Sequence, residues 1–206
     1  LNKFLNEAFS CTEHSRIVAD TMLEAIHART LYKFGNALQL PKNSSLSTIE
    51  LRMMNVREKP LQFIRKNDPE GFRIMDSDIC WSGLAEIEAN TFNPNKERVE
   101  QLRMYLKYMD FLSDEKNVLS YKDRAYVSKL LSCLNFLIEI RNLDEDTRQS
   151  LGVTDQKLET LINNLSQYIW INYQDENGFY MYQKGNEQNL LSPDATYHAM
   201  YLGSIT

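Results

Sequence analysis

Apolar residues recur at helical spacing over most of the chain. Between residues 96 and 112, and again between 154 and 172, they lie three or four positions apart with polar residues between them. This pattern predicts helices with one buried face. The stretch 121–140 differs, because its apolar residues occupy almost every side of a helix. A helix of that kind is buried on most sides, so we expect inner helices to alternate with outer ones.

Start and stop signals divide the chain into several helices. Ser47 and Glu50 have the spacing of a capping box, and Pro94 and Gly152 interrupt helical patterns. No sheet and no second domain is indicated, so we predict one all-α domain over residues 1–206. The expected helices span about residues 12–34, 48–66, 78–90, 96–112, 121–141, 154–172 and 194–204.

A short motif occurs twice along the chain. Residues 68–72 (DPEGF) match residues 175–179 (DENGF). Each copy is expected to form a loop that leads into an inner helix, with its glycine, Gly71 or Gly178, at positive φ. If the two segments adopt unrelated conformations, the repeat is a coincidence of sequence.

Composition and charge exclude several classes of protein. The chain has 206 residues, of which 43% are hydrophobic and 25% charged, as in globular domains. Its net charge is −5 without a dense basic patch, so nucleic acid is not an expected partner. No apolar run approaches the roughly 20 residues of a membrane helix. Because the chain begins with Leu1 rather than Met, we expect a fragment of a longer chain.

The cysteine count is odd and small. Cys11, Cys80 and Cys133 do not make a disulfide framework, which favours a reducing compartment. We therefore expect a cytoplasmic rather than a secreted protein. One bridge with one free thiol remains the alternative.

The second motif resembles the repeat of the α/α-toroid superfamily, which includes protein prenyltransferases, terpene cyclases and the thioester domains of macroglobulins. The resemblance is carried by Gly178 and Phe179 in the loop and by Thr196 and Tyr197 in the following helix. It extends over roughly residues 47–204 and implies a partial toroid. In addition, residues 11–14 (CTEH) are similar to the thioester motif, but His14 stands where the family has Gln, so no thioester would form.

The resemblance to prenyltransferases implies a metal site. Those enzymes hold zinc with an Asp, a Cys and a His, and Asp78, Cys80 and His198 supply these residue types here. Zinc is thus the cofactor that the resemblance implies, although Cys80 and His198 stand farther apart than in the family. The plainer interpretation is a capping Asp, a core Cys and an unrelated His.

Three aspartates are candidates for catalysis. Asp78, Asp123 and Asp194 each stand at the expected start of an inner helix. If these helices surround one axis, their carboxylates share one end of it, and crowding raises the pKa of one so that it can act as a general acid. The alternative is ordinary helix capping, which Asp favours.

Aromatic residues near the same positions are candidates for a ligand pocket. The expected lining residues are Phe72, Trp81, Tyr121, Phe179 and Tyr197. Such rings bind apolar or sugar ligands, although core packing also explains them.

Two functions follow: an enzyme or binding domain for an isoprenoid or glycan, or a non-catalytic recognition module that resembles a macroglobulin-type domain without a thioester. The ligand is a small molecule in the first case and a protein in the second. The enzyme hypothesis depends on the repeat.

Overall fold

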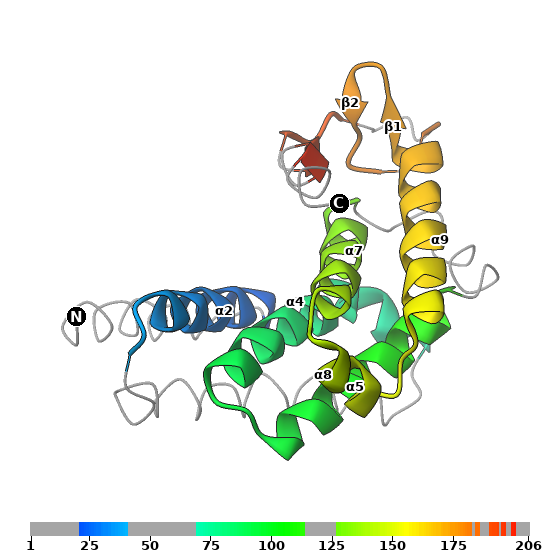
Figure 1. The fold of residues 1–206 in the computed structure, drawn as a ribbon. Helices are drawn as coiled ribbons and strands as arrows, with labels where there is room; N and C mark the ends of the chain where they lie inside the picture. The colour runs from blue at the N-terminus through cyan, green and yellow to red at the C-terminus, as the bar shows by residue number, and fades with distance from the viewer. Residues whose placement is uncertain are drawn as a thin grey trace.

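The computed structural model describes residues 21–40, 69–113, 127–182, 184–185, 190–193, 195–196 and 199–200. These parts of the chain are mainly helical, with one small hairpin (Figure 1). The predicted all-α class is confirmed. The elements are α2 (Thr21–Ala37), α4 (Pro69–Phe92), α5 (Lys96–Ser113), α7 (Val127–Arg141), α8 (Glu145–Ser150), α9 (Asp155–Tyr173), β1 (Gln174–Asp175) and β2 (Gly178–Phe179).

Helix α4 holds the described parts together. Helices α2, α5 and α7 pack against α4, and α9 packs against α7 and α5 (Figure 1). The helix begins at Pro69, a residue that suits a first turn because its ring fixes φ and it has no N–H to satisfy. It therefore starts nine residues earlier than the sequence predicts, and Gly71 lies inside a helix instead of a loop.

The other helices agree well with the hydrophobic pattern. Helices α5 and α9 match the predicted ranges to within one residue. The described part of the predicted helix 121–141 is α7, which is buried nearly all round as expected. Helix α8 is not among the predicted helices. The Asp144 side chain accepts a hydrogen bond from the Thr147 amide and caps α8.

Some predicted segments lie partly or wholly outside the described residues. These are the helix 48–66, the start of the helix 12–34, and several residues of the helix 194–204. No helix among the described residues is both long and apolar enough to cross a membrane.

The core consists of two packed clusters. The larger joins α4, α5, α7, α9 and the hairpin through branched aliphatic and aromatic side chains. Gly83 allows the close approach of α4 to α7, because a Cβ there would lie 2.5 Å from Cε2 of Phe136. The smaller cluster joins α2 to α4 mainly through alanines, together with the buried rings of Tyr32 and Phe92. Small residues on both helices let the two backbones lie close together.

Candidate functional site

The three predicted carboxylates are not shown to share a site. Asp78 lies within α4, more than two turns after the helix begins, so the prediction that it starts a helix is wrong. The helix already begins at Pro69, so the residues that were expected to form a loop before Asp78 are part of α4. Asp123 and Asp194 lie outside the described residues.

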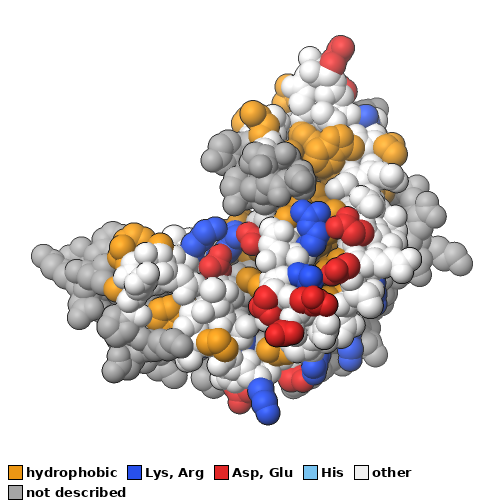
Figure 2. Space-filling view, in the orientation of Figure 1, with side chains coloured by type: hydrophobic (Ala, Val, Ile, Leu, Met, Phe, Trp, Pro, Cys, Tyr) orange, Lys and Arg blue, Asp and Glu red, His pale blue; other side chains and the backbone are white. Residues whose placement is uncertain are grey.

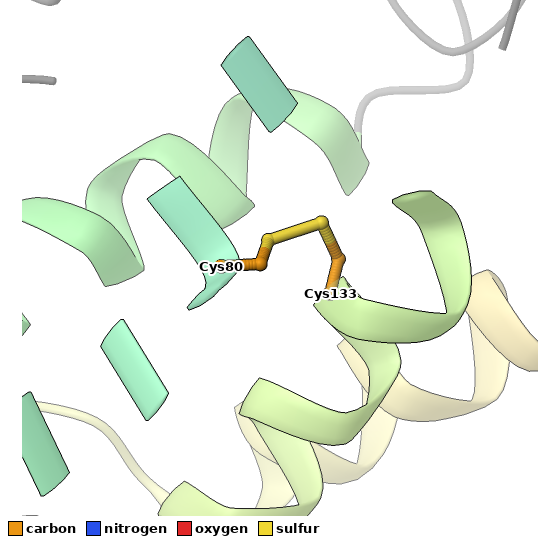
Figure 3. The surroundings of a disulfide bond; sticks show 2 residues. All are labelled: Cys80 and Cys133. Carbon is orange, nitrogen blue, oxygen red and sulfur yellow. A yellow bond between two sulfur atoms is a disulfide. The ribbon is translucent and has the colours of Figure 1, made fainter. Parts of the chain in front are cut away.

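The predicted zinc site is not formed in this structure. Cys80 is bonded to Cys133 through a disulfide that joins α4 to α7 (Figure 3). A sulfur atom in a disulfide carries no thiolate, so Cys80 has no lone thiolate for a metal. His198 lies outside the described residues, and no group of three or more His, Cys, Asp or Glu within the described ranges could hold a metal ion. The single bridge is the alternative that the cysteine count left open.

The residues predicted to line an aromatic pocket lie in different parts of the structure. Phe72 is part of α4 rather than of a loop, and Trp81 is half-buried on α4 against both core clusters. Phe179 is buried in β2, whereas Tyr121 and Tyr197 lie outside the described residues. The described residues therefore do not show the pocket that the sequence predicts.

Four charged residues link α2, α4 and α7, and we call them the charged seam: Arg29, Lys33, Glu88 and Glu139. Arg29 donates a 2.9 Å hydrogen bond to Glu139, and both cations lie 3.9 Å from Glu88. The guanidinium of Arg29 also lies 5.9 Å from the ring centre of Trp81. Burial raises the pKa of the Glu88 carboxyl, against the opposing effects of Lys33 and Arg29. These pairs lie within the chain, so the charged seam connects α2 to both α4 and α7.

The hairpin after α9 is built around the second copy of the sequence motif. Asp175 pairs with Gly178 across a two-residue turn, and Gly178 has φ 131°, as predicted for this glycine. The Asp175 carboxylate accepts bonds from the Asn177 amide and the Tyr180 hydroxyl, each at 2.8 Å. Both bonds lower the pKa of the Asp175 carboxyl, and the bond from the Asn177 amide has the larger effect. Asp175 therefore stays ionised at the tip of the hairpin.

The two copies of the motif therefore have unrelated conformations. Gly71 lies inside helix α4, whereas Gly178 lies in a β-strand. The condition set for the repeat is not met, so the match between residues 68–72 and 175–179 is a coincidence of sequence. Phe179 is nevertheless buried, as expected. Its ring lies nearly perpendicular to the ring of Trp170, and the two ring centres are 5.2 Å apart.

Exposed apolar side chains gather at this same end of the molecule. Seven large hydrophobic side chains are exposed among the described residues, and five of them lie between residues 170 and 200. We call these five the hairpin-end patch: Trp170, Ile171, Leu190, Leu191 and Met200. Figure 2 shows hydrophobic side chains at this end, whereas positive and negative groups alternate across the middle of the same view. Gathered exposure of this kind marks a binding surface more often than scattered single residues do.

Sequence reasoning missed this patch, although a signal was present. The buried face of α9 runs through Leu158, Leu161, Ile162 and Ile169. Trp170 and Ile171 lie about 100° and 200° around the helix from Ile169. Their side chains therefore do not point toward the buried face that Ile169 belongs to. Two large apolar residues off the buried face of an amphipathic helix indicate either a second contact or an exposed surface.

Comparison of the chain with models of protein families, with curated proteins and with solved structures finds no match. What the chain does is therefore inferred from its own geometry.

Proposed function

We propose that this chain is a non-catalytic recognition module that binds a protein partner through the hairpin-end patch. The observation that supports the proposal is the concentration of exposed apolar side chains at one end of the fold, with Ile171 68% and Met200 70% exposed. Their burial against a partner would remove apolar surface from water, which is the main favourable term in association. Trp170 is a suitable anchor, since Trp is enriched among residues that dominate binding energy.

The support beneath the patch is fixed by hydrogen bonds. Tyr180 donates its amide to the Tyr173 carbonyl at 2.8 Å, and Ser192 donates its amide to the Phe179 carbonyl at 2.7 Å. The Phe179 amide in turn donates to the Thr196 hydroxyl at 3.3 Å. These bonds connect α9, the hairpin and the segment that carries Leu190 and Leu191. A surface that is already ordered loses little entropy when it binds.

The hairpin also indicates the chemistry of the partner. Asp175 is held ionised at the turn, and Glu176 beside it is exposed. An apolar surface with acidic groups at its edge favours a partner that is apolar at the centre and carries Lys or Arg at the rim.

The enzyme hypothesis has less support. It required matched loops at Gly71 and Gly178, and these differ in conformation. It also drew on a thiolate from Cys80, which is in a disulfide.

Site-specific photocrosslinking tests the proposed function. A benzophenone amino acid is placed at Ile171, and a matched control carries it at Thr160, which is also exposed on α9 but away from the patch. Each protein is irradiated in an extract of the source organism. We expect one protein to crosslink at position 171 and not at 160, and the adduct to disappear when unlabelled chain competes.

Two results would refute recognition through this surface. One is the same set of adducts at positions 171 and 160, which indicates random collisions. The other is competition by a Leu191→Asp chain as effective as competition by the unchanged chain, since that variant places a charge within the patch.

A further inference from the structure

An asparagine on the outer side of α9 stands in the acceptor motif for N-linked glycosylation. The motif is Asn, then any residue except Pro, then Ser or Thr. Asn164, Leu165 and Ser166 match it. The other asparagines of α9, Asn163 and Asn172, do not, because Leu and Gln follow them at the third position of the motif. A second match, at residues 43–45, lies outside the described residues.

The fold leaves room for a sugar at Asn164. The residue is exposed, and it lies about 200° around the helix from Ile162, which belongs to the buried face of α9. Within the described part of the chain, the side-chain amide of Asn164 makes no hydrogen bond. A sugar attached to this amide therefore displaces no contact between the described residues.

The helical conformation of Asn164 is compatible with this modification. The sugar is transferred while the chain is still unfolded, so the acceptor does not need to lie in a loop of the finished fold. What the finished fold must provide is an outward-facing position, because the sugar is bulky and strongly hydrated. Asn164 has such a position.

The disulfide between α4 and α7 independently indicates the compartment in which this chemistry takes place. Cys80 and Cys133 are bonded, and both are 0% exposed. Because the bridge is enclosed by the core, it forms as the helices pack and not afterwards at the surface. Disulfides form and persist in oxidising compartments such as the lumen of the endoplasmic reticulum. The same lumen is where sugars are transferred to asparagine.

We infer that Asn164 carries an N-linked glycan, transferred in an oxidising secretory compartment from an oligosaccharide linked to a lipid pyrophosphate. In the transfer, Nδ2 of Asn164 forms a bond to C1 of the first sugar while the bond between C1 and the pyrophosphate oxygen breaks. That oxygen keeps the electron pair, and the released lipid pyrophosphate takes up the proton that Nδ2 loses. The inference makes no use of the hairpin-end patch, so it stands independently of the proposed function.

Peptide mapping of the chain purified from its source organism tests the inference. Peptide N-glycosidase in heavy-oxygen water removes the sugar and converts a glycosylated asparagine to isotopically labelled aspartate. We expect the label at Asn164 and none at Asn163, which is an exposed neighbour outside the motif. An unlabelled Asn164 would overturn the inference, and so would a label at Asn43 without one at Asn164.

Variants of the motif sharpen the test. Each full-length variant is secreted from cultured animal cells, and its intact mass gives the number of attached glycans. Asn164→Gln and Ser166→Ala remove the motif, so each should lose one glycan relative to the unchanged chain. Asn163→Gln and Ser166→Thr keep the motif and should lose none. These positions are exposed or half-buried on α9, so the fold should be kept. An unchanged number of glycans in Ser166→Ala, or the same loss in Asn163→Gln, would refute the site.

Discussion

The charged seam and the hairpin-end patch differ in what surrounds a tryptophan side chain. In the seam, Arg29 lies over the ring of Trp81 and also donates to Glu139, so the groups that meet this tryptophan belong to the same chain. At the hairpin end, Trp170 packs one edge against buried Phe179 and remains 38% exposed. The first arrangement closes an interface inside the molecule. The second leaves apolar area exposed to water, which is the surface that we propose a partner covers.

The two regions also differ in what holds them in place. The contact between α2 and α4 depends on a close approach of alanines, with charged and aromatic groups around it. The hairpin is held by backbone hydrogen bonds to α9 and to the segment around residue 192. Side-chain substitutions are therefore expected to weaken the α2–α4 region more than the hairpin end.

The largest effect is expected at Arg98. Its side chain is 2% exposed, lies 3.7 Å from the fully buried Glu86, and donates to the carbonyls of Ala89 and Asn93. Arg98→Met removes the cation beside the buried Glu86 and the donor to the Ala89 and Asn93 carbonyls, so the free energy of unfolding should fall by about 3–5 kcal/mol. Urea unfolding measures this change. Adding Glu86→Leu should recover most of the loss, and a single variant that loses less than about 1 kcal/mol would contradict the assignment.

Loss of the disulfide between Cys80 and Cys133 should also lower stability by several kcal/mol. It joins positions 53 residues apart, and loss of a bridge that closes a loop of this size costs about 2–4 kcal/mol. We expect the Cys80→Ala, Cys133→Ala double variant to lose stability by this amount in urea unfolding. Thiol titration of the unfolded chain should find one thiol without reductant and three with it. Three thiols without reductant would show that the bridge is absent.

Neighbouring isoleucines on α9 provide an internal comparison of the core with the patch. Ile169 is fully buried, whereas Ile171 is 68% exposed. Ile169→Ala should cost about 2–5 kcal/mol because it leaves a cavity, and Ile171→Ala should change the free energy of unfolding by less than about 0.5 kcal/mol. Thermal and urea unfolding of the two variants measure the difference. Comparable losses would mean that Ile171 is needed for the fold rather than for a partner.

The smallest effect concerns the pH dependence at Glu88. Burial raises the pKa of this carboxyl in the folded chain above its ordinary value of 4.5. A raised folded pKa contributes stability that is complete below 4.5 and is lost as the pH rises through the folded value. The unchanged chain should lose this stability as the pH rises from 4.5 through the folded pKa, whereas Glu88→Gln should not. The free energy of unfolding of Glu88→Gln minus that of the unchanged chain should therefore rise over this range and then level off. A relative stability that falls with pH would show that Arg29 and Lys33 outweigh burial.

Sequence patterns predicted the helices well wherever one face is buried. The spacing of Leu158, Leu161 and Ile169 determined both ends of α9 to within one residue. The start of α4 was missed, since Pro69 and Gly71 are typical of loops but are also compatible with a first turn. Local signals of this kind do not distinguish the two conformations, and tertiary packing decides between them.

The candidate site was less predictable, because it depends on which residues meet in space. Cys80 and Cys133 look unremarkable in the sequence, and only the packing of α4 against α7 brings them together. The hairpin-end patch likewise depends on the return of the segment carrying Leu190 and Leu191 to the hairpin. Gly178 was predicted correctly because its requirement is local.

Affinity measurement tests most directly whether the hairpin-end patch binds a partner. The protein that crosslinks at position 171 is titrated against the unchanged chain and against the variants Ile171→Asp and Thr160→Asp. Both substitutions add one negative charge to an exposed position on α9. We predict at least about tenfold weaker binding for Ile171→Asp and no change for Thr160→Asp. Equal affinities for the two variants would contradict the account.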